Sequence, residues 1–216
     1  TRGFDQPVWG TQRELGFVGS LVCIDPVLSK GRGLGMTHIK LVVGLGNPEP
    51  RYKDTRHNAG FWFVDELVRH YPLEFKFDSR FKGESANAQI NALPVRFLRP
   101  RTYMNESGQS VVLTMRYFDI PPDSVLVVHD DLDLAPGIVR LKKGGGHGGH
   151  NGLRDLIREI SSNDFFRLRL GIGHPGNSDE VTHYVLHKPL AEQRLAILGA
   201  ITRSVELLEP IISGDH

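Results

Sequence analysis

Two apolar runs limit what this 216-residue chain can fold into. Residues 39–45, IKLVVGL, are almost entirely apolar and are bounded by glycine and proline, and residues 124–131, SVLVVHDD, form a second such run. A strand with one solvated face alternates apolar and polar side chains, whereas a strand covered on both faces is apolar throughout. Both runs therefore predict strands in the middle of a sheet that is covered on its two faces.

The rest of the chain predicts helices alternating with further strands. SANAQI and VRFL are separated by the short NALP, which is typical of a hairpin and adds an antiparallel pair. Leu153, Leu156, Ile157 and Ile160 recur at helical spacing, so an amphipathic helix begins near Asn151. We predict an α/β fold, a single-domain three-layer sandwich whose mixed, mostly parallel, twisted sheet is flanked by helices. The other expected elements are helices over 59–71, 103–118 and 190–212 and strands over 138–143 and 165–173.

The chain divides into a leader and one domain. Residues 1–35 lack sustained periodicity and carry no signal-peptide cleavage pattern, and Met36 directly precedes the first strand. We expect residues 1–35 to be a leader that is disordered or derived from upstream sequence. Residues 36–216 then form the α/β domain, with a short C-terminal tail.

Composition excludes several classes of protein. The chain is 39% hydrophobic and has no apolar run of eighteen residues that could span a bilayer, so we expect no membrane association. The single cysteine, Cys23, excludes an internal disulfide framework and fits a reducing cytoplasm. Residues 1–35 hold four Lys/Arg and three Asp/Glu, which leaves 22 of each sign in the domain. A nucleic-acid partner would therefore need basic residues gathered on one face.

A glycine-rich loop interrupts the second half of the chain. Residues 144–149, GGGHGG, place five glycines within six positions, preceded by basic residues and followed by a helix. Glycine loses more conformational entropy on folding than any other residue, so such a loop indicates backbone shapes or close approaches that a Cβ would prevent. We expect a ligand to come close to this loop.

Polar side chains gather where the expected strands end. Asn47, Tyr52 and His57 follow the first strand, and Asp130 ends the second. In open α/β sheets, ligands bind beyond the carboxyl ends of the strands. A histidine can take a proton from water, and a carboxylate on its other nitrogen would fix the tautomer and stabilise the imidazolium.

Other interpretations of these residues remain open from spacing alone. GLGNPE lacks the third glycine of a dinucleotide fingerprint, GGGHGGHNG lacks the ending of a phosphate-binding P-loop, and no G-x-S-x-G elbow occurs. His147 and His150 with the acids of HDDLD could bind a metal, although the spacing does not provide a full ligand set. Asn151 would serve as an N-cap of its helix, and a single loop histidine such as His57 is more often structural than catalytic.

Four long motifs resemble the bacterial-type peptidyl-tRNA hydrolases. They are VVGLGNPEPRYKDTRHNAGFWFVDEL, RPRTYMNESGQSV, VVHDDLDLAPGIVRLKKGGGHGGHNGLRD and FFRLRLGIGHP, and the likeness runs from about residue 38 to the last helix. The resemblance implies an enzyme that hydrolyses the ester between a peptide and the 3′-ribose of tRNA, with no cofactor and no metal. It also implies that the partner is peptidyl-tRNA. The single cysteine favours the cytoplasm, and we expect a monomer because the sequence shows no obvious interface stripe.

The resemblance assigns roles to individual residues. His57 matches the general base, Asp130 the residue that orients it, and Asn47 the position that distinguishes a blocked from a free amino terminus. The matching substrate and tRNA contacts are Tyr52, Tyr103, Met104, Asn105, Asn151, His150, Lys142 and Arg140.

Two rival functions remain at this point. One is a metal-dependent hydrolase that uses His147 and His150, which a chelator would inhibit. The other is a non-catalytic RNA-binding module with Tyr52 or Tyr103 as stacking platforms, in which His57 would be dispensable.

Overall fold

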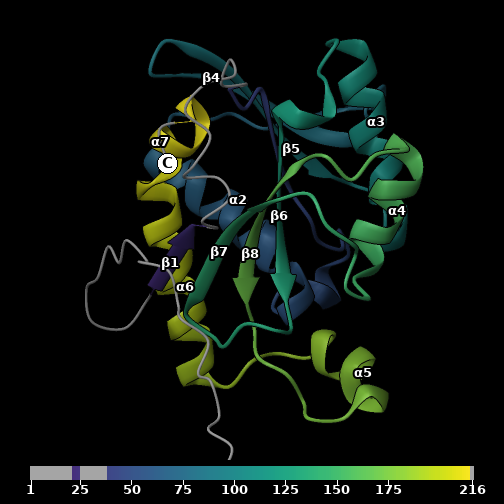
Figure 1. Cartoon of the computed structure of the whole chain (residues 1–216), viewed down its shortest axis with the longest axis vertical. Coiled ribbons are helices and arrows are strands. Elements are labelled where there is room, and N and C mark those ends of the chain that lie inside the picture. The colour runs from purple at the N-terminus through teal and green to yellow at the C-terminus, as the bar shows by residue number, and fades with distance from the viewer. Residues whose placement is uncertain (1–20, 25–37, 215–216) are drawn as a thin grey trace, which may run out of the picture.

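The strands of the described residues form one mixed sheet with helices on both faces (Figure 1). The fold is that of a computed structural model, which describes residues 21–24 and 38–214. The strand order is β1-β7-β8-β6-β2-β5-β4-β3, and four of the seven neighbouring pairs are parallel. The predicted α/β sandwich with a mixed sheet is therefore confirmed. The strands are β1 (Leu21–Ile24), β2 (Leu41–Gly44), β3 (Lys76–Asp78), β4 (Gly83–Ile90), β5 (Leu93–Pro100), β6 (Val125–Asp131), β7 (Ile138–Lys143) and β8 (Phe166–Gly171).

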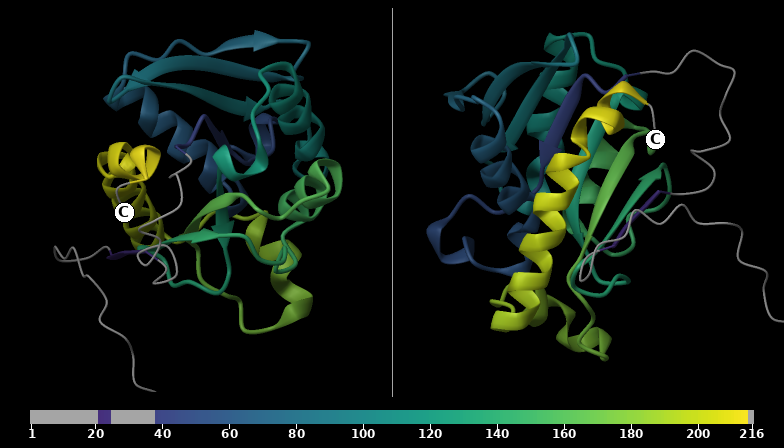
Figure 2. Two further views of the ribbon diagram at one scale, coloured as in Figure 1. Left: turned by 45° about the horizontal axis from the view of Figure 1, so that its top comes forward. Right: turned by 90° about the vertical axis from the view of Figure 1, so that its left-hand side faces the viewer.

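Two layers of helices cover the sheet, each over its own hydrophobic cluster. The cluster on one side includes residues of α2, α6 and α7, and the cluster on the other includes residues of α3 and α4. Figure 2 shows α6 and α7 running along one face of the sheet. In residues 21–24 and 38–214, no helix has the length and apolar character needed to cross a membrane. The helices are α2 (Ala59–His70), α3 (Ser107–Tyr117), α4 (Asn151–Ile160), α5 (Val181–Val185), α6 (Ala191–Glu206) and α7 (Leu208–Ser213).

The two apolar runs lie where the sequence predicts them. β2 pairs with β5 on one side and β6 on the other, so it is central. Val42 packs in the cluster under α2, and Leu41 and Val43 pack in the cluster under α3 and α4. Burial on both faces explains why the run does not alternate. The hairpin of β4 and β5 is confirmed as well.

Several elements differ from the prediction. β2 covers 41–44 rather than 39–45, and the helix expected over 103–118 consists of the 3₁₀ helix η3 (Met104–Glu106) followed by α3. Residues 21–24 of the expected leader form β1, which pairs in parallel with β7, because the edge of the sheet offers unpaired backbone groups. The predictions for 1–20 and 25–35 lie outside the described residues. The expected helix over 190–212 is two helices, because Pro210 lacks an N–H and its ring would clash with the carbonyl of Glu206 in a continuous helix. The short elements β3 and α5 were not predicted.

Three parallel strands deliver their following loops to the same edge of the sheet. β2, β5 and β6 are neighbours and run in the same direction. The loop after β2 contains the 3₁₀ helix η2 (Arg56–Asn58) and leads into α2, and the loop after β5 contains η3 (Met104–Glu106). The remaining 3₁₀ helices are η1 (Pro50–Tyr52), η4 (Pro122–Ser124) and η5 (Ser178–Glu180).

Close contact between β2 and α2 fixes the entry of that helix. A Cβ on Gly44 would lie 2.4 Å from the carbonyl oxygen of Gly60, and a Cβ on Gly60 would lie 2.4 Å from that of Leu45 and 2.5 Å from that of Val128. Only glycine lets these backbones approach so closely. The contact sets the position of the residues just before α2, which include His57.

We predict that Gly60→Ala lowers the free energy of unfolding by about 2 kcal/mol or more, because the added methyl group meets backbone atoms that cannot move aside. Denaturant unfolding measures this change. Gly199→Ala is the matched control: Gly199 lies exposed on α6, and a Cβ there would meet nothing within 4 Å. That variant should gain up to about 1 kcal/mol from helix propensity. Equal stability of the two variants would contradict the close-packing argument.

Candidate active site

A cleft of about 1160 Å³ lies at the edge where β2, β5 and β6 end. It is larger than a typical small-molecule pocket, which occupies roughly 300–1,000 Å³. Arg140 does not line it, although this residue lies on β7 opposite Arg169 of β8. The predicted residues that line the cleft are Asn47, Tyr52, His57, Tyr103, Met104, Asn105, Asp130, Lys142, His150 and Asn151.

One buried carboxylate binds two histidines at the base of the cleft. Nδ1 of His57 lies 3.0 Å from both carboxylate oxygens of Asp130, and Nε2 of His150 lies 3.0 Å from Oδ1. The exposed fractions are 7% for His57 and 3% for Asp130, so water does not screen the pair. The two imidazole rings are 4.9 Å apart between centroids. β6 supplies the carboxylate, and the chain just before α2 and α4 supplies the histidines.

The start of α4 fixes the tautomer of His150. Its Nδ1 accepts hydrogen bonds from the backbone N–H groups of Gly152 and Leu153, at 3.1 and 3.3 Å. An accepting Nδ1 carries no proton, so the proton of the neutral ring is on Nε2 and is donated to Asp130. His150 is thus the N-cap of α4. The prediction that Asn151 caps this helix is wrong, because Asn151 is already the first helical residue and its Oδ1 accepts from Arg154.

The tautomer of His57 follows from the same carboxylate. Because Asp130 is an acceptor, Nδ1 of His57 donates to it, and Nε2 is left without a proton and without a hydrogen-bond partner in the described part of the chain. Burial lowers the pKa of His57, while the charge of Asp130 and the hydrogen bond raise it, and the net shift is upward. Burial alone would raise the pKa of Asp130, but the two histidines and their hydrogen bonds hold it well below its usual range.

A third histidine lies beneath this pair. His129 is 2% exposed, its Nδ1 is 2.7 Å from the backbone oxygen of Asp130, and its ring stands edge-on to that of His150 with centroids 5.1 Å apart. Burial lowers the pKa of His129 to about 3, so the ring is neutral at physiological pH. It adds a neutral wall behind His150 and no competing charge.

Asn47 is held in one orientation by its neighbours. Its Oδ1 accepts from the backbone N–H of Met104 at 2.9 Å, which leaves the Nδ2 group to donate. The side chain of Asn58 holds the backbone of Asn47. Oδ1 of Asn58 accepts from the N–H of Asn47 at 2.8 Å, and Nδ2 of Asn58 donates to the carbonyl of Asn47 at 3.0 Å. The loop before α2 and the loop after β5 are therefore tied together at Asn47.

Two tyrosines stand at the rim of the cleft. Tyr103 is 48% exposed and its hydroxyl donates to Glu49, which also pairs with Arg51 at 2.6 Å. The guanidinium of Arg51 lies over the ring of Tyr52, 4.7 Å from its centroid. Both tyrosines line the cleft. Asn105, next to Met104, is exposed at the same rim.

The structure adds a role that the sequence did not predict for Asn58, and it adds Arg167, which was not predicted as a site residue. Asn58 was expected among the polar residues that follow the first strand, but spacing gave no sign that its buried amide would hold the backbone of Asn47. Arg167 is 3% exposed and donates to backbone carbonyls of the glycine loop. The alternation of arginine with apolar residues along FRLRLG was its signal, because a charge on a strand of a buried sheet needs a specific partner.

The residues able to hold a metal differ from the rival prediction. Within the described residues, the group of three or more that converges is His57, Asp130 and His150, whose ligand atoms lie within 4.8 Å of one another. His147 is not a member, and its Nδ1 accepts from the N–H of Gly149. In the group that does converge, Nδ1 of His57 and Nε2 of His150 already donate hydrogen bonds to the carboxylate of Asp130.

Comparison with known proteins identifies the family. The family model described as Peptidyl-tRNA hydrolase matches residues 41–216. The chain belongs to the peptidyl-tRNA hydrolase family. A peptidyl-tRNA hydrolase from Halorhodospira halophila is 47% identical over 178 residues, which cover 82% of this chain and 92% of the relative. One from Acinetobacter baumannii is 48% identical over 180 residues, which cover 83% and 93%.

Solved structures agree with this assignment. The crystal structure of peptidyl-tRNA hydrolase from Acinetobacter baumannii matches with a TM-score of 0.81 and 47% identity, over 85% of this chain and 93% of that one. The family's reaction is hydrolysis of peptidyl-tRNA, and this chain is accordingly a hydrolase of the ester bond in peptidyl-tRNA. The resemblance noted from the four motifs is confirmed.

We predict that Asp130→Asn moves the acidic limb of the pH profile of kcat/KM to lower pH. A histidine that acts as a base must be unprotonated, so activity that depends on His57 is expected to rise with pH through the pKa of His57, which lies above its ordinary value of 6.5. Without the carboxylate, burial alone acts and lowers that pKa. The plateau should also fall by about a hundredfold or more, because the tautomer is no longer fixed. Asp133→Asn, at an exposed carboxylate of the following turn, is the control, and an unshifted limb in Asp130→Asn would contradict the coupling.

Proposed function

We propose that His57 is the general base of peptidyl-tRNA hydrolysis in this chain and that Asp130 orients it. The observation that carries the proposal is the nitrogen Nε2 of His57, which belongs to a cleft-lining ring fixed by Asp130 and which has no partner among the described residues. His150 is unsuited to this role because hydrogen bonds engage both of its nitrogens.

The proposed reaction begins with a water molecule on Nε2 of His57. The imidazole removes one proton as the water oxygen attacks the ester carbonyl, and Asp130 stabilises the imidazolium that forms. The tetrahedral intermediate then expels the 3′-oxygen of the ribose, which takes the proton back from His57. The products are a peptide with a free carboxylate and tRNA with a 3′-hydroxyl.

Asn47 is proposed to donate its Nδ2 group to a carbonyl of the substrate. The backbone N–H of Met104 occupies Oδ1 and so fixes this orientation. Asn105 and Asn151 offer further carboxamides at the rim and at the start of α4, and such neutral donors stabilise a developing oxyanion without attracting a cation.

Selectivity for a blocked amino terminus follows from the state of the acids in the cleft. Asp130 is bound by two histidines, and Arg169 pairs with both Asp131, at 2.6 Å, and Asp133, at 3.5 Å. Asp155 accepts from the N–H of Gly108 and pairs with Arg158. An aminoacyl-tRNA would bring an ammonium group that loses its hydration and finds no unpaired carboxylate among the described residues that line the cleft, whereas a peptidyl amide carries no charge.

The tRNA is proposed to approach over the tyrosines and the basic residues of β7. Tyr52 and Tyr103 can stack on bases of the single-stranded acceptor end, and Met104 and His150 form the wall beside the ester. Lys142 and Arg140 would face phosphates. We further propose that the protein acts as a monomer in the cytoplasm, where peptidyl-tRNA is produced, and that it needs no metal.

We predict that the wild type releases N-acetyl-aminoacyl groups from tRNA with and without a chelator. His57→Ala should lower kcat by about a hundredfold or more, the typical contribution of a positioned base. Unblocked aminoacyl-tRNA should be spared. The measurement is the rate of release of labelled amino acid from each substrate.

His174→Ala provides a matched control, because this cleft-lining histidine only accepts from the nearby N–H of Gly176. Loss of wild-type activity with chelator would favour a metal at His57, Asp130 and His150. Binding of tRNA without release would make the protein an RNA-binding module.

A further inference from the structure

Arg167 is a buried cation without an ion-pair partner in the described part of the chain. It lies on β8, is 3% exposed and lines the cleft, with its guanidinium 4.7 Å from the centroid of the Phe165 ring. Burial and, after it, the charge of Arg169 lower the pKa of Arg167 to about 10. Buried charges in proteins are normally paired with an opposite charge, so the hydrogen bonds that Arg167 makes instead of an ion pair require an explanation.

The partners of Arg167 are two carbonyl groups of the glycine loop. Nη1 donates to the oxygen of Gly146 and Nη2 to that of Gly145, both at 2.5 Å. In a trans peptide the N–H points opposite to the C=O, and no cis peptide occurs among the described residues. The N–H groups of Gly146 and His147 therefore point away from Arg167. Neither has a hydrogen-bond partner within residues 38–214, and both residues line the cleft.

Gly146 indicates that something approaches this backbone. Gly145, Gly148 and Gly149 have φ values of +101°, +54° and +80°, a backbone conformation that favours glycine, so their backbone explains why these positions are glycines. Gly146 has no such φ, is exposed, and a Cβ added there would meet nothing within 4 Å. The fold thus tolerates a side chain at 146. A ligand that contacts the backbone explains why none is present.

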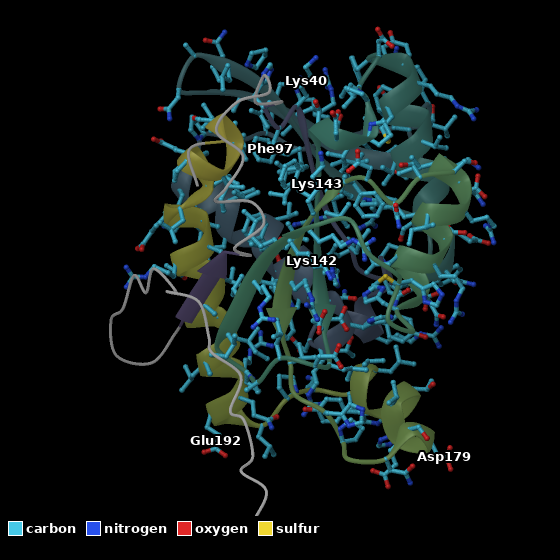
Figure 3. The ribbon with its side chains drawn as sticks, viewed as in Figure 1. Lys40, Phe97, Lys142, Lys143, Asp179 and Glu192 are labelled. Atoms are coloured by element: carbon cyan, nitrogen blue, oxygen red, sulfur yellow. The ribbon has the colours of Figure 1, made fainter. Side chains whose placement is uncertain are left out.

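The charge around the loop defines the class of ligand. A Cβ on Gly145 would lie 3.3 Å from Nζ of Lys142 and 4.0 Å from Nη1 of Arg167, so the two cations flank the loop. Strand register places Arg140 opposite Arg169 and Lys142 opposite Arg167, which puts all four on one face of the sheet. Figure 3 labels Lys142 and Lys143, the last two residues of β7 before the loop. Successive N–H groups beside cations bind anions.

We propose that Arg167 is a positioning residue that holds the N–H groups of Gly146 and His147 toward the cleft, where they bind a phosphate oxygen of the acceptor strand of the tRNA. The inference rests on the proposed function, because the tRNA supplies the phosphate. It assigns the glycine loop to the phosphate chain of the substrate and leaves the ester to His57 and Asn47.

The test compares two substrates that share the ester and differ in phosphate. N-acetyl-aminoacyl-tRNA carries the acceptor strand, and the N-acetyl-aminoacyl ester of adenosine carries no phosphate. Gly146→Ala keeps the N–H but places a methyl group where the phosphate would approach, and Arg167→Lys loses the fork that orients the two N–H groups. Each variant should raise KM for the tRNA substrate by about tenfold, comparable to the loss of one hydrogen bond to a charged group, and leave kcat within about twofold. For the adenosine ester, kcat/KM should not change. Arg167→Lys keeps the charge and loses the fork that binds two carbonyls.

Gly199→Ala is the matched control, with the same open space at a distant exposed glycine. Equal losses on both substrates would overturn the proposal, because the loop would then act on the ester. Unchanged KM in Gly146→Ala would also overturn it. Binding of deacylated tRNA to the wild type and to Gly146→Ala is measured separately by fluorescence anisotropy. About tenfold weaker binding by the variant supports the phosphate contact even if the wild type hydrolyses neither substrate, in which case the proposed function fails instead.

Discussion

The carboxylate of Asp130 is the group on which the arrangement of the site depends. It is almost fully buried, and a buried carboxylate is stable only when hydrogen-bond donors replace the water that it loses. Those donors are His57 before α2 and His150 before α4, so one charge aligns two helices on opposite faces of the sheet. The contacts that stabilise Asp130 also fix the orientation of His57, the proposed base.

The two histidines differ in the surroundings of the ring nitrogen that does not contact Asp130. The amide groups at the start of α4 engage the second nitrogen of His150, so this ring is a fixed donor and a helix cap. The second nitrogen of His57 is left without a partner among the described residues. Two identical side chains on one carboxylate are thereby distinguished, and the difference comes from the backbone N–H groups of a helix terminus.

The glycine loop connects this centre to the basic face of the sheet. It begins at the end of β7, where Lys142 lies opposite Arg167, and it ends at His150. Arg167 donates to the carbonyls of Gly145 and Gly146 near the start of the loop, and Asp130 accepts from His150 at its end. A substrate that is both an ester and a polyanion would therefore meet a continuous segment of backbone, with cations at one end and the proposed catalytic pair of His57 and Asp130 at the other.

The sequence by itself determined the sheet, the hairpin, most of the helices and the family, because buried strands and long ordered motifs are local patterns. It also pointed to His57, Asp130 and Asn47, since polar residues after buried strands gather at one edge. It did not determine that β1 joins the sheet, that His150 rather than Asn151 caps α4, or that Asn58 and Arg167 hold the loops. These were decided by contacts between segments far apart in the chain. A hydrogen bond from Arg167 to Gly146 spans 21 positions, and no periodicity or spacing encodes which nitrogen of a histidine will be left without a partner.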